Sequence, residues 1–205
     1  MRKLAIGVGT LVVVAGAAFY GWRAYSGPSA PPPQVVVGGV VADFTLADTN
    51  GQSHSLASLR GSQGTLLLFI STRCPVSNNY NERMEALHQK YGVRGIRVVG
   101  INANRNEPVE EVRRHAQEKG LTFVILKDVS NRIADYFGAS VTPEAYLLDA
   151  KNGLRYQGRL DASQHKPSLN ANELRAVLDA LLNGQAISNT GKKAFGCSIK
   201  RVPAD

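Results

Sequence analysis

Two stretches of the chain are apolar at nearly every position, and they predict the central strands of a sheet. Thr65–Ile70 and Ile96–Asn102 have strand length and no regular polar alternation, which is typical of strands buried on both faces. Between them, the apolar residues of Ser77–Tyr91 recur every three or four positions, so an amphipathic helix is predicted there. Similar patterns predict strands at Asp43–Leu46, Leu121–Leu126, Ala145–Asp149 and Leu154–Gln157, and helices at Ser55–Leu59 (one turn), Pro108–Lys119, Asn131–Phe137 and Glu173–Leu182.

The order of these elements predicts the fold class. Strands and helices alternate, and they are followed by an antiparallel hairpin, with its turn at Lys151–Gly153, and by a last helix. This order indicates an α/β fold with a mixed central β-sheet flanked by helices on both faces. Asn50-Gly51 supplies the positive φ angles of a tight turn, so a hairpin turn is expected at Thr49–Gln52.

The N-terminal segment predicts an anchor in a membrane. No charged residue occurs from Leu4 to Trp22, a length close to the roughly 20 residues that cross a bilayer as a helix. Two cations precede this run, and the positive-inside rule then leaves the N-terminus in the cytoplasm and exports the rest of the chain. We expect a single-pass transmembrane anchor at residues 1–25 in the inner (cytoplasmic) membrane, with cleavage of a signal peptide after Ala30 as the alternative.

Composition marks three further parts of the chain. The proline-rich residues 26–40 are predicted as a stiff tether. Residues 41–184 are predicted as the folded domain, and residues 185–205 as a C-terminal extension that carries Cys197. The anchor would place this domain in the periplasm or another extracytoplasmic space.

The net charge of +8 does not by itself indicate a nucleic-acid partner. Lys and Arg are scattered along the chain and form no stripe with interleaved aromatic residues, which would be expected of a nucleic-acid interface. A generally basic surface instead suits a domain that is held near anionic lipid headgroups. We expect no nucleic-acid partner.

Cys74 is the main candidate for chemistry. It follows a buried strand, precedes Pro75 and stands at the start of a helix, where unpaired N–H groups and the helix dipole stabilise a thiolate. Thiols in such places have lowered pKa values and react with disulfides, and Arg73 adds a cation next to this one. Ser77 stands where a dithiol site would have its second sulfur. The plain alternative is that Cys74 is a small buried apolar residue.

Pro143, just before the strand Ala145–Asp149, is a second feature of the predicted site. A cis proline there would present backbone polar groups to a partner that docks at the thiol, and an ordinary trans proline is the alternative. Glu144 is interpreted either as a base or as an exposed residue. The residues beside the cysteine and the proline form the expected substrate groove: Arg73, Pro75, Thr142 and Glu144.

Four segments, in this order, resemble the thioredoxin-like superfamily. They are DFTLADTNGQSHSLASLRG, LLLFISTRCPVS, YFGASVTPEAYLLD and FGCSIK. The chain is most similar to the redoxin branch, which includes TlpA-like and peroxiredoxin-like proteins, and its last segment is similar to the Gly-Cys-x-Ile-Lys tail of the latter. The resemblance implies a thioredoxin fold in which Cys74 is the nucleophile and Pro143 is a cis proline that faces it.

Two departures limit the activity that this resemblance implies. Thioredoxins and TlpA-like reductases have Cys-x-x-Cys, whereas Ser77 stands at the second position here, so no disulfide forms within this motif. Peroxiredoxins have Pro-x-x-x-Thr-x-x-Cys. Counted back from Cys74, this chain has Ser71 in place of Thr and Leu67 in place of Pro. Peroxide reduction is therefore not expected to be the main activity.

The chain has two cysteines, and Cys197 is the simplest partner for Cys74. In an exported protein an even number of cysteines usually indicates pairing. We expect a reversible bond: Cys74 attacks a substrate disulfide, and Cys197 resolves the mixed disulfide. The alternatives are a permanent structural disulfide, and a reaction by Cys74 alone in which Ser77 donates a hydrogen bond to the thiolate.

The sequence thus predicts an extracytoplasmic thiol–disulfide oxidoreductase without a cofactor. Its partners would be a protein dithiol or disulfide and a membrane or periplasmic electron partner. The rival class is a non-catalytic module of the same fold, such as a metal chaperone or an assembly factor. No metal site is predicted, because the four histidines have no ligand spacing with either cysteine: His54, His88, His115 and His165. A copper or zinc ion bound by the two cysteines and one histidine is the alternative.

Overall fold

The structure is a computed structural model, and it describes residues 33–162, 173–188 and 190–203. Its strands are β1 (Thr45–Asp48), β2 (Ser53–Ser55), β3 (Gly64–Ile70), β4 (Ile96–Asn102), β5 (Val124–Lys127), β6 (Val141–Thr142), β7 (Glu144–Asp149), β8 (Leu154–Gly158) and β9 (Cys197–Ser198). Its helices are α1 (Pro75–Asn78), α2 (Asn81–Gly92), α3 (Val109–Glu118), α4 (Arg132–Phe137) and α5 (Glu173–Leu182).

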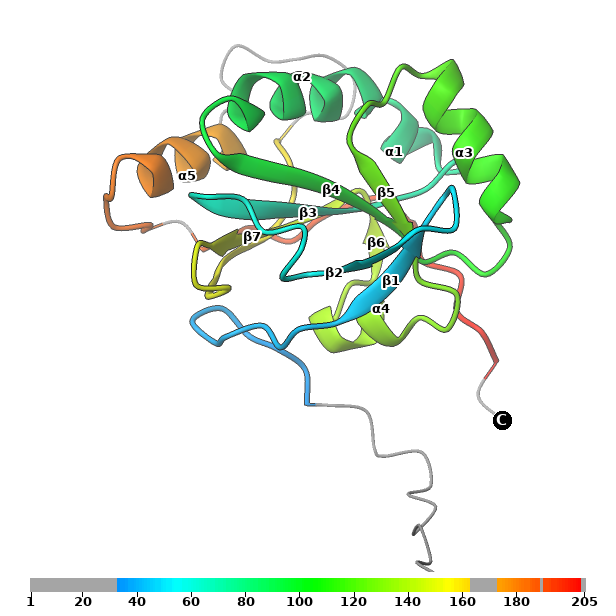
Figure 1. The fold of residues 1–205 in the computed structure, drawn as a ribbon, viewed down its shortest axis with the longest axis horizontal. Helices are drawn as coiled ribbons and strands as arrows, with labels where there is room; N and C mark the ends of the chain where they lie inside the picture. Colours follow the sequence, from blue (N-terminus) through cyan, green and yellow to red (C-terminus); the bar gives the residue numbers. More distant parts are fainter. Residues whose placement is uncertain (1–32, 163–172, 189, 204–205) are drawn as a thin grey trace, which may run out of the picture. The chain divides into compact units, whose positions relative to one another are not determined.

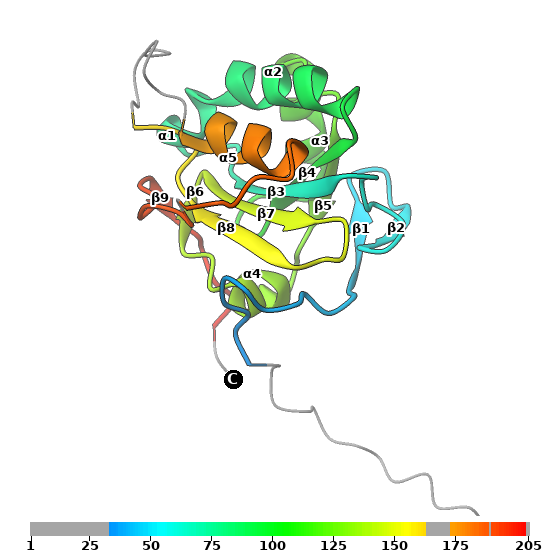
Figure 2. The same ribbon diagram turned by 90° about the vertical axis from the view of Figure 1, so that its left-hand side faces the viewer.

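The main sheet has the strand order β2-β1-β5-β4-β3-β7-β8 (Figures 1 and 2). β3, β4 and β5 are parallel, whereas β1, β7 and β8 run antiparallel to their neighbours. A separate antiparallel pair joins β6 to β9. Because β3, β4 and β5 point the same way, they finish at one end of the sheet, here called the carboxyl edge.

Helices cover both faces of the main sheet. α2, α3 and α5 pack on one face and α4 packs on the other (Figure 1). All seven residues of β3 are buried, as expected of an uninterrupted apolar run. Leu66 and Leu68 join the core under α2, whereas Leu67 and Phe69 point to the opposite face and join Phe137 of α4. The predicted mixed sheet with helices on both faces is confirmed.

The predicted helix Ser77–Tyr91 is in fact two helices. α1 starts earlier, at Pro75, and the chain turns at Asn79 and Tyr80 before α2 begins. The four residues whose helical spacing led to the prediction nevertheless lie in the same core: Tyr80, Met84, Leu87 and Tyr91. The apolar period therefore identified the buried face correctly, but it did not reveal the break.

Three further boundaries differ from the predictions. Residues 56–59 form a hydrogen-bonded turn rather than part of a helix, and Ser55 belongs to β2, where it is paired with Thr45 of β1. Leu121 precedes β5, since its N–H donates to the carbonyl of Ala116 and so closes the end of α3. Pro108 has an extended backbone (ψ 155°) and stands just before α3 rather than within it.

The predicted transmembrane anchor lies outside the described residues. Within the part of the chain that the structure describes, no helix is both long enough and apolar enough to span a bilayer. Val35 belongs to the core on the α4 side, and its N–H donates to the carbonyl of Tyr136 at 2.9 Å. The chain therefore joins the folded domain before residue 41, where the tether was expected to end.

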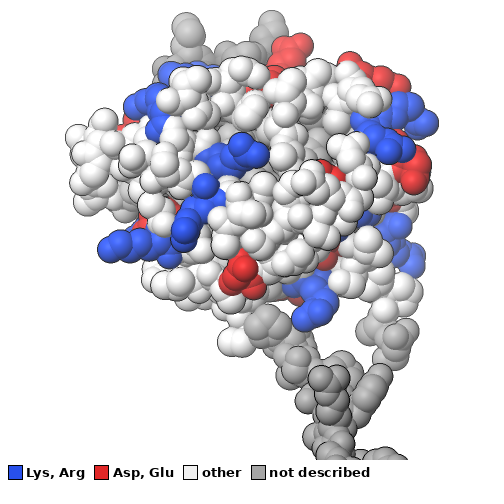
Figure 3. Space-filling view, viewed as in Figure 1, with Lys and Arg blue, Asp and Glu red and all other residues white. Residues whose placement is uncertain are grey.

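The C-terminal extension lies along the domain instead of leaving it. The carbonyls of Thr190 and Lys192 accept the N–H groups of Gln157 and Arg159 at 3.0 Å, beside β8. The chain then reaches β9, which lies next to β6 (Figure 2). On the face shown in Figure 3, Lys and Arg side chains form several separate groups rather than one stripe.

Candidate redox site

Cys74 lies at the carboxyl edge, at the junction of β3 and α1. Its backbone is extended (φ −82°, ψ 114°), and its sulfur accepts the N–H of Ser77 at 3.3 Å, so that Cys74 caps α1. Pro75 is the first residue of the helix, where the missing N–H of proline costs no hydrogen bond. The strand-cysteine-proline-helix order read from the sequence is therefore the local structure.

Backbone groups from three parts of the chain enclose the sulfur of Cys74. Besides the N–H of Ser77, it accepts the N–H of Cys197 at 3.4 Å, and it donates to the carbonyl of Thr142 at 3.2 Å. The Thr142–Pro143 peptide bond is cis, as the resemblance implies. Cys74 is 2% exposed, so a protein substrate reaches this sulfur only if neighbouring residues move.

Cys197 approaches Cys74 on β9, and its pairing partner in β6 is Thr142. Gly196 makes this close approach possible. A Cβ at this position would lie 1.9 Å from the carbonyl oxygen of Thr142, and its φ of +153° is rare for other residues. Both cysteines are free thiols, and Cys197 is partly exposed. The fold thus brings together two cysteines that are 123 residues apart in the chain.

The contacts of the two thiols move their pKa values in opposite directions. Burial raises the pKa of Cys74, but hydrogen bonds from the Cys197 thiol and from the N–H groups of Ser77 and Cys197 outweigh it, so the pKa is lowered overall. The pKa of Cys197 is raised, mainly by its hydrogen bond to Cys74 and then by burial. Cys74 is therefore the more acidic thiol of the pair, and it loses its proton at a lower pH than Cys197 does.

Ser77 and Arg73 make contacts that differ from those predicted. The hydroxyl of Ser77 accepts the N–H of Ser71 at 3.1 Å, and it is the main-chain N–H of Ser77 that reaches the sulfur. The guanidinium of Arg73 binds Glu111 with hydrogen bonds of 2.9 and 2.5 Å and lowers the pKa of Glu111 to about 2. Arg73 is thus paired with a carboxylate beside the site.

Glu144 is buried at the start of β7, so its interpretation as an exposed residue is wrong. Its carboxylate accepts the N–H of Ser140 at 3.1 Å. Burial raises the pKa of Tyr146, and the charge of Glu144 adds to this rise. Of the four residues expected to form the groove, Pro75 and Thr142 adjoin the thiol, whereas Arg73 and Glu144 are bound to other partners.

Glu107 supports the turn before Cys74, and the sequence-based reasoning did not select it. Its buried carboxylate accepts the hydroxyl of Ser71 at 2.5 Å and the N–H of Thr72 at 3.0 Å. The oxygen of Ser71 in turn accepts the N–H of Cys74 at 3.0 Å. The available signal was the polar stretch Asn102–Glu107, which directly follows a buried strand at the active end of the sheet.

A buried amine continues this network. Nζ of Lys127 donates to the side-chain oxygen of Asn102 at 2.6 Å and to the carbonyl of Asn104 at 2.7 Å, and burial lowers the pKa of Lys127. The amide of Asn102 donates to Glu107 at 2.5 Å. Hydrogen bonds therefore run without a break from the end of β5 to the turn that carries Cys74.

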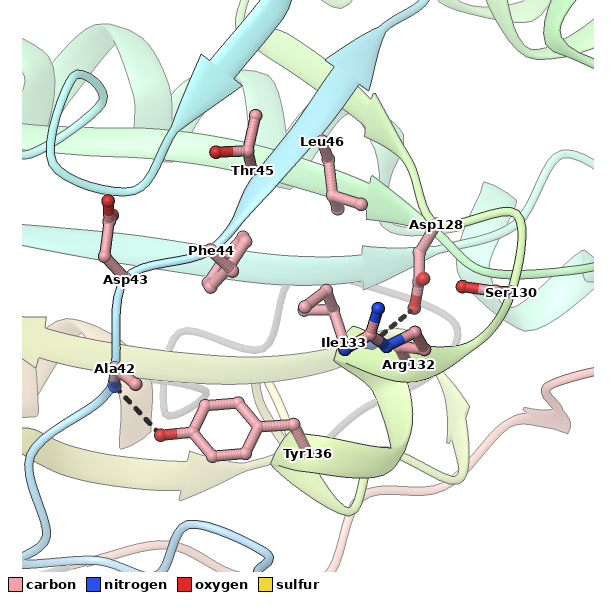
Figure 4. A pocket seen from close by; sticks show the side chains of 10 residues that line it. All are labelled: Ala42, Asp43, Phe44, Thr45, Leu46, Asp128, Ser130, Arg132, Ile133 and Tyr136. Carbon is pink, nitrogen blue, oxygen red and sulfur yellow. Dashed lines mark hydrogen bonds between the residues drawn. The ribbon is translucent and has the colours of Figure 1, made fainter. Parts of the chain in front are cut away.

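A pocket of about 290 Å³ lies elsewhere, between residues 42–46 and the start of α4 (Figure 4). Asp128 in its wall accepts the N–H groups of Ile133 and Ala134 at 3.0 and 2.8 Å and so caps α4. Neither cysteine lines this pocket, and neither does Pro143. It is therefore separate from the redox site.

The three described histidines contact residues other than the two cysteines. His54 lies 3.0 Å from the carboxylate of Asp48, His115 lies 3.2 Å from the amide of Asn81, and the ring of His88 packs edge-on against that of Phe123. In the described ranges, no three His, Cys, Asp or Glu side chains are grouped so that they could hold a metal ion. His165 lies outside those ranges.

Known proteins resemble this chain over most of its length. A family model described as AhpC/TSA family matches residues 37–157. Thiol-disulfide oxidoreductase ResA of Geobacillus thermodenitrificans (strain NG80-2) is 30% identical over 144 residues, which cover 70% of this chain and 80% of ResA. Thioredoxin-like protein YneN of Bacillus subtilis (strain 168) is 32% identical over 152 residues, 74% of this chain and 86% of YneN. A crystal structure of a protein from Sinorhizobium meliloti 1021 has a TM-score of 0.77 and 32% identity, and covers 83% of this chain and 97% of that one.

Proposed function

Since this chain belongs to the AhpC/TSA family and has a thioredoxin-like fold, we propose that it is a thiol–disulfide oxidoreductase with Cys74 and Cys197 as its redox-active pair. The pairing of β9 with β6 carries the proposal, because it lays Cys197 beside the sulfur of Cys74. The name of the ResA relative supports the reaction class.

In the reduced protein, Cys74 is the nucleophile. Its thiolate attacks one sulfur of a protein disulfide, and the other substrate sulfur leaves as a thiolate, so that a mixed disulfide forms on Cys74. Cys197 then loses its proton and attacks the sulfur of Cys74, which releases the rest of the substrate as a second thiolate. The substrate disulfide gains two electrons, and Cys74 and Cys197 lose them as they form a disulfide.

The pKa values of the two thiols suit these roles. The lowered pKa of Cys74 makes its thiolate available for attack and makes it a good leaving group in the reverse reaction. The raised pKa of Cys197 keeps this thiol protonated until a mixed disulfide has formed. Because Cys74 is buried beneath β9, a protein substrate has to displace β9 before it meets the thiolate.

We further propose that the domain lies outside the cytoplasm and that residues 1–25 hold it to the inner membrane. The uncharged run from Leu4 to Trp22 and the two cations before it support this placement. The partners are then a protein dithiol or disulfide and a membrane or periplasmic electron partner. A fusion of alkaline phosphatase after residue 203 should be active in living cells, and an inactive fusion would place the domain in the cytoplasm.

The full-length protein, equilibrated in glutathione and then in dithiothreitol buffers, tests the redox pair. A maleimide polymer that adds mass to each free thiol should reveal a bond that forms and breaks reversibly, and Cys74→Ser and Cys197→Ser should each abolish both the bond and the reduction of insulin disulfides. A bond that only strong reductant breaks would support a structural disulfide. Activity that survives in Cys197→Ser would assign the reaction to Cys74 alone.

A further inference from the structure

Beyond Cys197, the extension crosses the carboxyl edge, where two asparagine side chains bind its backbone. The side-chain oxygen of Asn104 accepts the N–H of Lys200 at 2.8 Å. The side-chain oxygen of Asn131 accepts the N–H of Val202 at 2.7 Å. The two contacts are two residues apart in the extension, so both asparagines bind the same side of an extended segment.

Both asparagines are built into the domain. Asn104 is 3% exposed and Asn131 is 1% exposed, and they stand in different loops, one after β4 and one before α4. The amide of Asn131 donates to the carbonyl of Ala103 and so joins the two loops. Lys127 fixes Asn104 through the main-chain carbonyl of Asn104, which leaves the asparagine side chain for the extension.

The peptide groups around Lys200 are held on both sides. Its N–H is bound by Asn104, and its carbonyl accepts the N–H of Arg105 at 2.9 Å. One residue earlier, the N–H of Ile199 donates to the carbonyl of Ser140 at 3.0 Å, and the side chain of Ile199 is buried. These contacts bind backbone groups, so they hold the extension in place and do not depend on the side chain of Lys200.

The loop that holds the extension also holds the turn before Cys74. Asn104 binds the segment that follows Cys197, and Glu107, three residues further on, accepts hydrogen bonds from Ser71 and Thr72. The two cysteine-bearing segments are thus positioned by one short stretch of chain. A shift of Lys200 would move Cys197, because only two residues separate them.

We propose that Asn104 and Asn131 are positioning residues that hold the extension by its backbone and thereby keep Cys197 over the sulfur of Cys74. The catalytic purpose of this hold rests on the proposed function, but the hold itself does not. The residues of the extension that it fixes, Cys197 to Val202, act as a bound peptide at the carboxyl edge.

Alkylation of Cys74 in the full-length Cys197→Ser protein measures the hold, since Cys74 is then the one thiol in the chain. The buried sulfur reacts with iodoacetamide when the extension lifts, so the rate follows the lifted fraction. Asn104→Ala should raise the rate roughly fivefold, the equivalent of one ordinary hydrogen bond. Asn104→Asp keeps the acceptor and should react like the parent. Asn106→Ala, at an exposed position in the same loop, is the matched control and should also react like the parent.

A second measurement asks whether the hold serves the reaction. In the protein with both cysteines, the thiolate of Cys74 attacks oxidised glutathione, one glutathione leaves as its thiolate, and the other stays on Cys74 as a mixed disulfide. Cys197 then loses its proton, its sulfur attacks that of Cys74, and the second glutathione leaves as its thiolate. The bound glutathione displaces the extension, so closure depends on its return, and Asn104→Ala should slow glutathione release roughly fivefold. Asn104→Asp should restore the rate, which a loss of global stability would not allow.

The outcomes separate this inference from the proposed function. If glutathione stays on Cys74 in the parent while Asn104→Ala still speeds alkylation, the redox pair is wrong and the hold is real. If the pair closes normally and Asn104→Ala changes neither rate, the hold is overturned and the proposed function stands. An effect in Asn104→Ala that Asn104→Asp does not rescue would also overturn the role of the side-chain oxygen.

Discussion

Replacement of Gly196 by alanine should uncover the buried thiolate. The added Cβ would lie 1.9 Å from the carbonyl oxygen of Thr142 and 2.7 Å from its carbonyl carbon. Both are backbone atoms next to the Thr142–Pro143 bond, so no side-chain movement relieves the collision. β9 has to move away from β6, and the segment that carries Cys197 then no longer covers Cys74.

The size of the effect follows from what the docked state loses. A non-glycine residue at φ +153° costs on the order of 1–3 kcal/mol. The hydrogen bonds from Cys197 to Cys74 and from Ile199 to Ser140 are lost on undocking in the parent and in the variant alike, so they cancel from the comparison. Because the collision with the carbonyl of Thr142 adds to the strain, we take the upper end of the range, about 3 kcal/mol, which at about 1.4 kcal/mol per factor of ten corresponds to a roughly hundredfold rise in the undocked population.

Cys74 alkylation in the Cys197→Ser background should therefore be roughly a hundredfold faster with Gly196→Ala than without it. Gly120→Ala is the matched control: its φ of +63° imposes comparable backbone strain, but no atom lies within 4 Å of the added Cβ. The control should leave the rate unchanged. An unchanged rate in Gly196→Ala itself would refute the argument, because it would mean that the close approach of β9 does not protect the sulfur.

Three further predictions concern charge and access. The alkylation rate of Cys74 should reach half its maximum at a lower pH in Cys197→Ser than in Cys197→Ala, because only serine keeps a hydrogen-bond donor for the thiolate. Equal midpoint pH values in the two variants would contradict the assigned hydrogen bond. A bulky maleimide polymer should label Cys197 in Cys74→Ser faster than Cys74 in Cys197→Ser, and the reverse order would show that β9 opens freely. Arg159 and Lys192 lower the pKa of Glu173 from 4.5 to about 2, so the ionised carboxylate stabilises the fold fully above pH 4.5. This stabilisation, about 1–2 kcal/mol after allowance for solvent screening, is lost as the pH falls towards 2. Urea denaturation should show a weaker loss over that range for Glu173→Gln, whereas Glu118→Gln, in an exposed pair, should follow the parent.

The central strands could be predicted because a strand that is buried on both faces is an uninterrupted apolar run in the sequence. Ile96–Asn102 was predicted with the bounds that β4 has, and the prediction of β3 differs by one residue. The position of Cys74 could be predicted from the same apolar run, since a cysteine shortly after such a strand lies at the carboxyl edge. The break between α1 and α2 could not be predicted, because Tyr80 at the break lies in the same core as the apolar residues of α2 and so keeps the helical spacing.

The polar support of the site could not be predicted in the same way. Glu107 lies in a polar stretch of the sequence, and Lys127 is a charged residue at the end of an apolar run; charged residues at such positions are usually exposed. They are buried here because each finds its partners in another segment: Glu107 at Ser71 and Thr72, and Lys127 at Asn102 and Asn104. Contacts between distant segments of this kind do not appear in a periodic pattern. The pairing of β6 with β9 could not be predicted either, because each strand has two residues and so shows no periodic pattern; Gly196 was the one sign of a close approach of the backbone.

The absence of a second cysteine at position 77 has a consequence for how the site works. In a Cys-x-x-Cys motif both sulfurs stand on one helix turn, so oxidation moves little else. Here the hydroxyl of Ser77 holds the N–H of Ser71, and the second sulfur comes from a segment that also covers the first. In the reaction that we propose, closing or opening the bond between Cys74 and Cys197 is therefore tied to the position of β9. The same movement would then govern both the access of a substrate to Cys74 and the availability of Cys197, because the segment that covers Cys74 also carries Cys197.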